Sequence, residues 1–173
     1  CTALSLAEVG AQVVCVARTQ TDVDAQVSSI EAIGAKACAV VADVTEAADR
    51  KKIISASLDR FGRIDVLVNN AGGTGHGPTS DISDKQVYET IRVNFMAPVY
   101  LSRDCIPHMQ DQGAGAIVNI STYATFEPEA AFPTSGVFRA GLAAFTKLFC
   151  DKYAAEGLRM NNVLPGFIDS LHI

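Results

Sequence analysis

The sequence has few cysteines, and none of them lies close to another. The five cysteines stand at positions 1, 15, 38, 105 and 150, so the chain has no CxxC pair and no spacing typical of a zinc site or a redox motif. The three histidines, at positions 76, 108 and 172, form no pair at ligand spacing either. We therefore expect no metal site, and we expect reduced thiols that mostly fill the core.

The chain also lacks long apolar stretches and an excess of positive charge. Its apolar runs are far shorter than a membrane span, and its first residues, CTALSLAEVGAQVVCVAR, have neither the basic region nor the cleavage site of a signal peptide. The net charge is -5 and the pI is near 5.1, with acidic and basic residues interspersed, so there is no basic stripe for a nucleic acid backbone. These absences predict a cytoplasmic protein with no nucleic-acid and no membrane partner.

What is present is typical of one globular unit. The 173 residues are 49% hydrophobic and 19% charged, which is enough apolar material to bury a sizeable core. No repeat, linker or low-complexity segment marks a boundary. The sequence therefore predicts a single domain over residues 1–173.

Short apolar segments alternate with helical ones along the whole chain. Runs rich in β-branched residues lie at about 11–17, 35–44, 64–68, 115–121 and 160–166, and helical patterns lie at about 2–10, 21–33, 45–62, 83–111 and 134–156. Thr45 is a plausible N-cap for the third helix, and Gly34 and Gly62 are helix stops. Because the strand-like runs are hydrophobic throughout, the pattern indicates an α/β fold with a parallel sheet and helices on both faces.

The segments at the ends of the predicted strands are rich in polar residues, glycine and proline. They are Asp43 and Val44, the run Asn69 to Gly73, Ser121 and Thr122, and Pro165 and Gly166. Each set by itself is ordinary turn chemistry. In parallel sheets, however, ligands bind beyond the carboxyl ends of the strands, and these sets all lie there. The carboxyl edge of the sheet is therefore the predicted site.

Several motifs resemble those of the short-chain dehydrogenase/reductase family. They are DVLVNNAG at 65–72, LAEVGAQVV, ADVT at 42–45, VNF at 93–95, GAIVNIS at 115–121 and MNNVLPG at 160–166, and together they cover essentially the whole chain. The resemblance implies a Rossmann-like, doubly wound parallel sheet that binds a nicotinamide dinucleotide. It places the adenine near Asp43 and Val44, and it places the backbone of Asn70, Ala71 and Gly72 along the cofactor cleft. It also places Pro165 and Gly166 near the nicotinamide.

The end of the strand-like run at 11–17 indicates which cofactor binds. An acidic residue there bonds the ribose hydroxyls of NAD, whereas a basic residue pairs with the 2′-phosphate of NADP. This chain has Ala17 at the acidic position, followed by Arg18. The sequence therefore favours NADP(H) over NAD(H). The alternative is that Arg18 is a solvated charge at a strand end.

The catalytic motif of the family is degenerate in this chain. The family has a carbonyl-polarising serine, a proton-transferring tyrosine, a lysine four residues later and an asparagine in a proton relay. The resemblance places Thr122 at the serine and Asn94 at the asparagine, but Ser135 stands at the tyrosine and Arg139 at the lysine. An aliphatic hydroxyl is a far weaker acid than a phenol, so chemistry is more affected than cofactor binding. Tyr123, beside Thr122, is the one tyrosine close to this site; it is either a displaced proton donor or a packing aromatic.

The two ends of the chain also depart from the family pattern. No glycine-rich strand and turn precedes CTALSLAEVG, and the chain stops at GFIDSLHI, where the family continues into a substrate-covering segment. We therefore expect a partial dinucleotide-binding domain without its first strand. We also expect the 173-residue chain to be inactive by itself.

Two functions remain open from the sequence. One is an NADP(H)-dependent oxidoreductase, active at full length on a small carbonyl or alcohol substrate. The other is a binding or scaffold protein without dehydrogenase chemistry, or a fragment without function. The resemblance further predicts a homo-oligomer, a dimer or tetramer, formed through the helical regions 83–111 and 134–156. His76, in the loop GGTGHGP, could contact the substrate.

Overall fold

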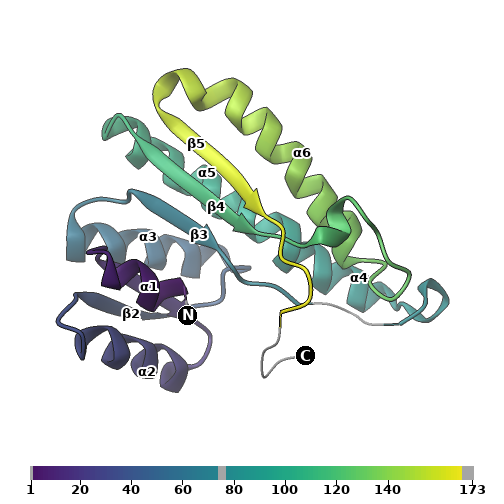
Figure 1. Cartoon of the computed structure of the whole chain (residues 1–173), viewed down its shortest axis with the longest axis horizontal. Coiled ribbons are helices and arrows are strands. Elements are labelled where there is room, and N and C mark those ends of the chain that lie inside the picture. The colour runs from purple at the N-terminus through teal and green to yellow at the C-terminus, as the bar shows by residue number, and fades with distance from the viewer. Residues whose placement is uncertain (1, 74–76, 169–173) are drawn as a thin grey trace. The chain divides into compact units, whose positions relative to one another are not determined.

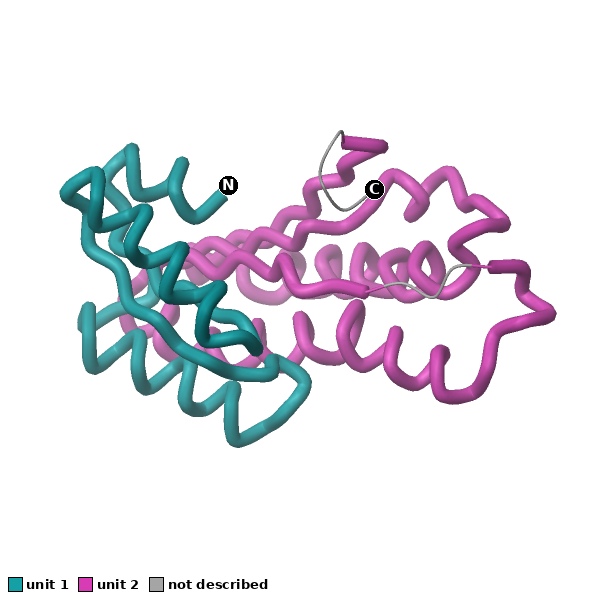
Figure 2. The backbone as a smooth tube through the Cα atoms, turned by 90° about the horizontal axis from the view of Figure 1, so that it is seen from below, with its two compact units in different colours: residues 1–64 teal, residues 65–173 magenta. Residues whose placement is uncertain are grey.

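The chain forms two compact units, residues 1–64 and residues 65–173, coloured separately in Figure 2. We describe them from a computed structural model, which covers residues 2–73 and 77–168. His76 lies outside these residues. The prediction of a single domain over 1–173 stays a prediction, and each unit is described by itself.

The first unit is a two-stranded parallel sheet with three helices (Figure 1). Its elements are α1 (Thr2–Glu8), β1 (Val13–Ala17), α2 (Gln20–Glu31), β2 (Ala37–Val41) and α3 (Ala47–Phe61). Its core joins both strands to the first two helices through Ala7, Cys15, Ile30 and Ala37. Burial of these small apolar side chains from four elements holds the unit together.

The second unit is a three-stranded parallel sheet in the order β3-β4-β5. Its elements are β3 (Val66–Asn69), η1 (Thr79–Asp81), α4 (Asp84–Ile91), the π-helical turn η2 (Arg92–Met96), α5 (Ala97–Asp111), β4 (Gly115–Ile120), η3 (Tyr123–Thr125), α6 (Ser135–Tyr153), η4 (Ala154–Glu156) and β5 (Leu158–Val163). Figure 1 shows α6 running alongside β5, and α5 packs against β3 and β4. Consecutive parallel strands joined by helices are the architecture that the alternation predicted.

Most element boundaries follow local sequence signals. Ser83 begins α4 with a capping box, in which its side chain and that of Gln86 each bond the other's backbone N–H. Gly62 ends α3 in the left-handed region, at φ 75°, where glycine is favoured. The prediction that Thr45 caps α3 is wrong. Glu46 holds that position, and the hydroxyl and backbone N–H of Thr45 instead donate to the Asp43 carboxylate at 2.7 and 2.9 Å.

The helical region predicted at 83–111 is interrupted by a π-turn. α4 ends at Ile91, the wider turn η2 follows, and α5 continues from Ala97. π-turns are rare and often lie at functional sites. Among residues 2–73 and 77–168, no helix is both long and apolar enough to cross a membrane.

Candidate active site

The turn after β3 leaves its backbone accessible. Asn69, the last residue of the strand, is buried, but Asn70, Ala71, Gly72 and Gly73 are all exposed. A small or glycine-rich turn of this kind allows a ligand to approach the main chain closely. The structure therefore leaves three of the predicted cofactor residues open at the carboxyl end of a strand.

Asn94 lies in the π-turn and holds this glycine turn. Its side chain is 1% exposed. Its Nδ2 donates to the carbonyl oxygen of Gly73 at 2.7 Å, and its Oδ1 accepts from the N–H of Gly73 at 3.3 Å. A buried amide satisfied on both sides fixes its partner firmly, because breaking either bond would leave a buried polar group unpaired. The sequence analysis named both Asn94 and Gly73 but did not predict that they bond each other.

Arg139 joins Asn94 to the end of β4. Its Nη1 donates to the carbonyl oxygen of Ile120, the last residue of that strand, and its Nη2 donates to Oδ1 of Asn94 at 3.3 Å. Burial lowers the pKa of Arg139, but a guanidinium remains protonated in a protein. Two predicted catalytic residues, Asn94 and Arg139, are therefore in direct contact.

Thr122 lies just beyond β4 and begins the short helix η3. Its Oγ1 accepts from the N–H of Ala124 at 3.3 Å. The neighbouring Ser121 is buried, and its hydroxyl lies 3.2 Å from that of Thr125. Since the hydroxyl proton of Thr122 is not used in its capping bond, it remains available for a ligand.

The loop after β5 is bonded to the same place. The N–H of Tyr123 donates to the carbonyl oxygen of Pro165 at 3.1 Å. Gly166, the next residue, is exposed, and a Cβ at that position would meet nothing within 4 Å. The structure therefore brings the predicted residues Pro165 and Gly166 beside the segment that carries Thr122.

Ser135 is the first residue of α6 and is 4% exposed. The start of this helix packs tightly on η3, because a Cβ at Gly136 would lie 2.9 Å from the carbonyl oxygen of Ala124. Ser135 and Arg139 are four residues apart and so share one face of the helix. The hydroxyl at the tyrosine position is thus close to the site in the fold but largely shielded from water.

Tyr123 is held by the carboxylate of Glu129. Its hydroxyl donates to Oε1 of Glu129, and this bond is the main cause that raises the pKa of Tyr123 to about 12. Its ring lies 5.6 Å from that of Phe167. A higher pKa makes the phenol a weaker acid, so this geometry does not favour Tyr123 as a displaced proton donor.

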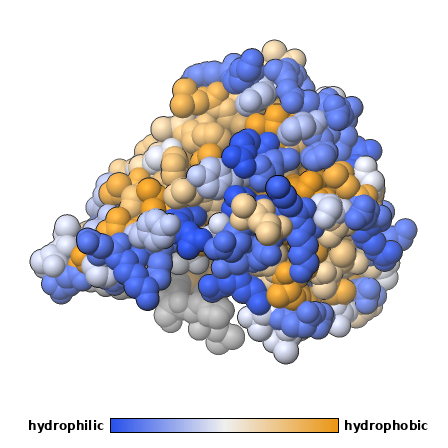
Figure 3. Space-filling view, turned by 180° about the vertical axis from the view of Figure 1, so that it is seen from behind, coloured by the Kyte–Doolittle hydropathy of each residue, from blue (hydrophilic) through white to orange (hydrophobic). Residues whose placement is uncertain are grey.

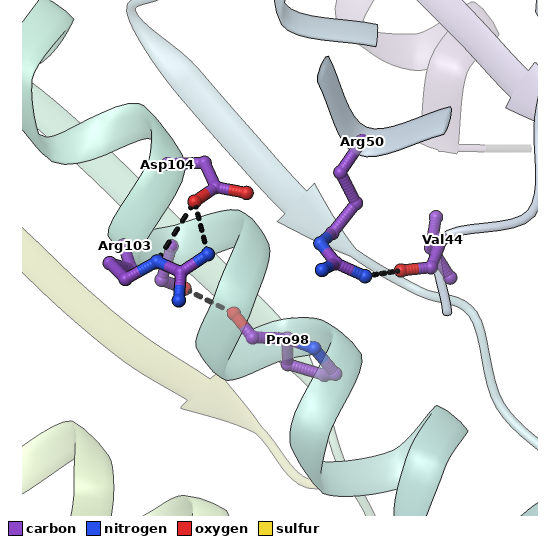
Figure 4. A network of polar contacts seen from close by, with 6 residues as sticks. Val44, Arg50, Pro98, Arg103 and Asp104 are labelled. Atoms are coloured by element: carbon purple, nitrogen blue, oxygen red, sulfur yellow. Dashed lines mark hydrogen bonds and ion pairs between the residues drawn. The ribbon is translucent and has the colours of Figure 1, made fainter. Parts of the chain in front are cut away.

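Three predicted cofactor residues lie in the first unit. Arg18 follows β1 and is exposed. The backbone N–H of Asp43 donates to the Asp49 carboxylate at 2.7 Å, and the carbonyl oxygen of Val44 accepts from Arg50 at 3.0 Å (Figure 4). These bonds order the segment after β2. The relation of Arg18, Asp43 and Val44 to the second unit stays a prediction.

A row of buried amides crosses the sheet of the second unit, and sequence reasoning missed it. Asn69, Asn119 and Asn162 lie opposite one another on β3, β4 and β5. Asn119 accepts from Asn69 at 2.8 Å and donates to Asn162 at 3.0 Å and to Thr146 of α6 at 3.3 Å. The sequence contained a signal for this row, since each of the three strands carries an asparagine near its end.

In the part of the chain that the structure describes, no three His, Cys, Asp or Glu side chains form a group that could hold a metal ion. The site is therefore built from amides, hydroxyls, backbone groups and one guanidinium.

Comparison with known proteins identifies the family. Residues 1–172 match the family model for short chain dehydrogenase. The chain belongs to this family. Dehydrogenase/reductase SDR family member 4 of Homo sapiens is 30% identical over 164 residues, which are 94% of this chain and 59% of that relative. Ketoacyl reductase HetN of Nostoc sp. is 31% identical over 166 residues, which are 96% of this chain and 58% of that relative. The chain thus spans about three-fifths of the length of these curated relatives.

Solved structures agree with this assignment. A crystal structure from Burkholderia xenovorans, assigned to the short-chain dehydrogenases/reductases, has a TM-score of 0.91 at 30% identity and covers 97% of this chain and 67% of its own. One from Sinorhizobium meliloti 1021, assigned to the short-chain alcohol dehydrogenases, has a TM-score of 0.93 at 27% identity, with 98% and 68% covered. The predicted α/β fold class with parallel strands is confirmed. Family membership implies a nicotinamide dinucleotide cofactor.

Proposed function

We propose that the protein is an NADP(H)-dependent oxidoreductase that interconverts a carbonyl compound and an alcohol. The observation that carries this proposal is the contact of Arg139 with Asn94 and with the end of β4, beside an accessible glycine turn. This contact brings groups proposed for cofactor binding and groups proposed for the reaction to the carboxyl ends of adjacent strands, where ligands of open α/β sheets bind.

The residues present fit a dinucleotide. The exposed residues Asn70, Ala71 and Gly72 supply backbone donors and acceptors. The open space at Gly166 leaves room near Pro165 for a flat ring. We propose that the first three residues line the cofactor and that Pro165 and Gly166 lie next to the nicotinamide.

The choice of NADP(H) rests on Arg18. It is exposed at the end of β1 and follows alanine instead of an acidic residue, so a guanidinium is offered to the 2′-phosphate without a repelling carboxylate at that position. Replacing Arg18 with Ala in the full-length protein is expected to weaken NADPH binding about 10-fold or more, as for a charge-assisted hydrogen bond, and to leave NADH binding unchanged. Unchanged NADPH binding would instead fit the alternative, that Arg18 is a solvated charge.

Reduction of a carbonyl gives different roles to the hydroxyls of Thr122 and Ser135. The bound cofactor supplies a hydride to the carbonyl carbon, and one proton must then reach the carbonyl oxygen to give the alcohol. We propose that the Thr122 hydroxyl donates a hydrogen bond to that oxygen, and that Ser135 or a water beside it supplies the proton. Because Ser135 is buried and only weakly acidic, this step is slow compared with a tyrosine-dependent one.

Oxidation of NADPH by a panel of carbonyl substrates tests the proposal in the full-length protein. Turnover that is lost in Thr122→Val, with NADPH binding retained, is the expected result. No turnover with any substrate, alongside intact binding, would overturn the catalytic part and support a dinucleotide-binding or scaffold protein.

We also propose a homo-oligomer formed through α4, α5 and α6. Several large side chains on α4 and α6 are exposed: Val137 at 63%, Leu148 at 68% and Tyr88 at 62%. Apolar patches also lie among polar ones on the face drawn in Figure 3. Exposed apolar surface of this kind favours association. Light scattering of the full-length protein should give a dimer or tetramer mass, and a monomer mass would contradict the proposal. Cell fractionation tests the predicted cytoplasmic location.

A further inference from the structure

The guanidinium of Arg139 donates hydrogen bonds to acceptors within the protein. It bridges the carbonyl oxygen of Ile120 and the Oδ1 of Asn94 through its two terminal nitrogens. Within residues 2–73 and 77–168 no carboxylate pairs with it. The side chain is partly buried, which lowers its pKa. Because the guanidinium is planar and rigid, its bonds to two neutral acceptors fix the positions of both relative to each other.

The Asn94 side chain is equally committed. Its Nδ2 donates to the Gly73 carbonyl oxygen, and its Oδ1 accepts both the Gly73 N–H and Nη2 of Arg139. With 1% exposure it has little access to water. The contacts thus form one chain, from the end of β4 through Arg139 and Asn94 to the glycine turn. An amide held in this way positions the turn and has little freedom to pass a proton.

Gly72 packs against the same guanidinium. A Cβ added at Gly72 would lie 2.5 Å from Nη2 of Arg139 and 3.3 Å from Oδ1 of Asn94. A Cβ added at the next residue, Gly73, would meet only Cγ1 of Val93 at 4.0 Å. The lack of a side chain at Gly72 therefore leaves room for Arg139, whereas Gly73 is under no such constraint.

We propose that Arg139 is a positioning residue that sets the Gly72–Gly73 turn through Asn94, and that it does not act by contacting the dinucleotide. This rests on the proposed function, because the turn is taken to line the cofactor. A lysine at position 139 keeps the charge, but its single nitrogen cannot hold both acceptors in the planar geometry of the fork. On this account the arginine cannot be replaced by the lysine of the family motif.

The test measures NADPH binding to the full-length protein by the fluorescence of the reduced nicotinamide, in variants that stay folded. Arg139→Lys is expected to weaken binding about 10-fold, and Gly72→Ala is expected to weaken it similarly by displacing the guanidinium. Arg159→Lys, the same change at an exposed arginine near the start of β5, is the matched control and should change the affinity less than about 2-fold. The double variant of Gly72 and Arg139 should bind no more weakly than Arg139→Lys, because the two changes break the same contact.

A direct role of Arg139 at the nucleotide predicts the opposite. Wild-type affinity in Arg139→Lys, or fold-losses of the two single variants that multiply in the double variant, would overturn the proposal. A residue that only stabilises the fold would lower the unfolding midpoint of Arg139→Lys and leave its NADPH affinity unchanged, which would also overturn it.

Measurements on the ligand-free protein distinguish failure of the positioning proposal from failure of the proposed function. If no dinucleotide binds, the same variants are compared by their unfolding midpoints. Gly72→Ala should then lower the midpoint when Arg139 is present and should have little further effect in Arg139→Lys. Additive midpoint shifts would overturn the positioning contact itself.

Discussion

The buried amide row gives a prediction that needs no ligand. Asn119 is 0% exposed and makes bonds to Asn69 at 2.8 Å, to Asn162 at 3.0 Å and to Thr146 at 3.3 Å. Replacing Asn119 with Leu removes all three. Asn162 still accepts from Thr146 at 3.2 Å, but the buried Asn69 amide loses its acceptor.

The size of the effect follows from this count. A net loss of about 1 kcal/mol per hydrogen bond, with about 1–3 kcal/mol for a stranded buried donor and an offsetting gain from the apolar leucine, gives about 2–4 kcal/mol of destabilisation. That is a large share of the roughly 5–15 kcal/mol that stabilises a typical domain. For a chain of this size it lowers the melting temperature by about 6–12 °C.

Urea unfolding followed by circular dichroism measures this change. Asn161→Leu is the matched control, because Asn161 neighbours the row on β5 but is exposed. Replacing Asn69 and Asn119 together by leucine should cost less than the sum of the single changes, since no donor is then stranded. Additive losses, or an Asn119→Leu variant within about 0.5 kcal/mol of the control, would refute the reasoning.

Three further predictions concern other parts of the molecule. Glu129→Gln should lower the pKa of Tyr123 from about 12 toward its ordinary value near 10. Because the folded pKa is raised, the Tyr123–Glu129 bond stabilises the fold below pH about 10, and this stabilisation is lost as the pH rises toward 12. An unchanged ultraviolet titration of the phenol would contradict this prediction. Gly157→Ala should destabilise the protein by about 2–3 kcal/mol in a denaturant titration, because Gly157 has φ +80° and its Cβ would lie 2.4 Å from the Gly113 carbonyl oxygen. Gly62→Ala is the control and should cost about 1 kcal/mol, because Gly62 has φ +75° but its Cβ would meet nothing within 4 Å. Equal losses in the two variants would show that the contact with the Gly113 backbone does not matter. Cys105, 1% exposed and with a pKa raised to about 12 by burial, should react with a thiol reagent only on unfolding, and rapid reaction of the native protein at this residue would be inconsistent with its burial.

The sequence was sufficient to predict the architecture because its signals are local. Apolar β-branched runs, helical periodicity and the stop at Gly62 depend only on neighbouring residues, and the structure confirms the order of strands and helices. Helix ends were less certain, as Thr45 shows: its hydroxyl had two possible partners, and the Asp43 carboxylate was the one it bonds.

The site was predicted only in part, because its contacts join residues far apart in the chain. The family resemblance named Asn94, Thr122, Ser135 and Arg139 as candidates, but it gave no indication that Arg139 would bridge to Asn94. The π-turn around Asn94 has no sequence signature of its own. The amide row depends on strand register, which is set by packing across the whole sheet.

Dinucleotide binding is the central claim, and the unfolding midpoint of the full-length protein tests it most directly. The midpoint is measured without ligand and with saturating NADPH or NADH, because a ligand that binds only the folded state stabilises it, by about 2.7 kcal/mol at 100 times its Kd. The account predicts a clear rise with NADPH and a smaller one with NADH. An unchanged midpoint with both cofactors, in a protein that unfolds cooperatively, would contradict it.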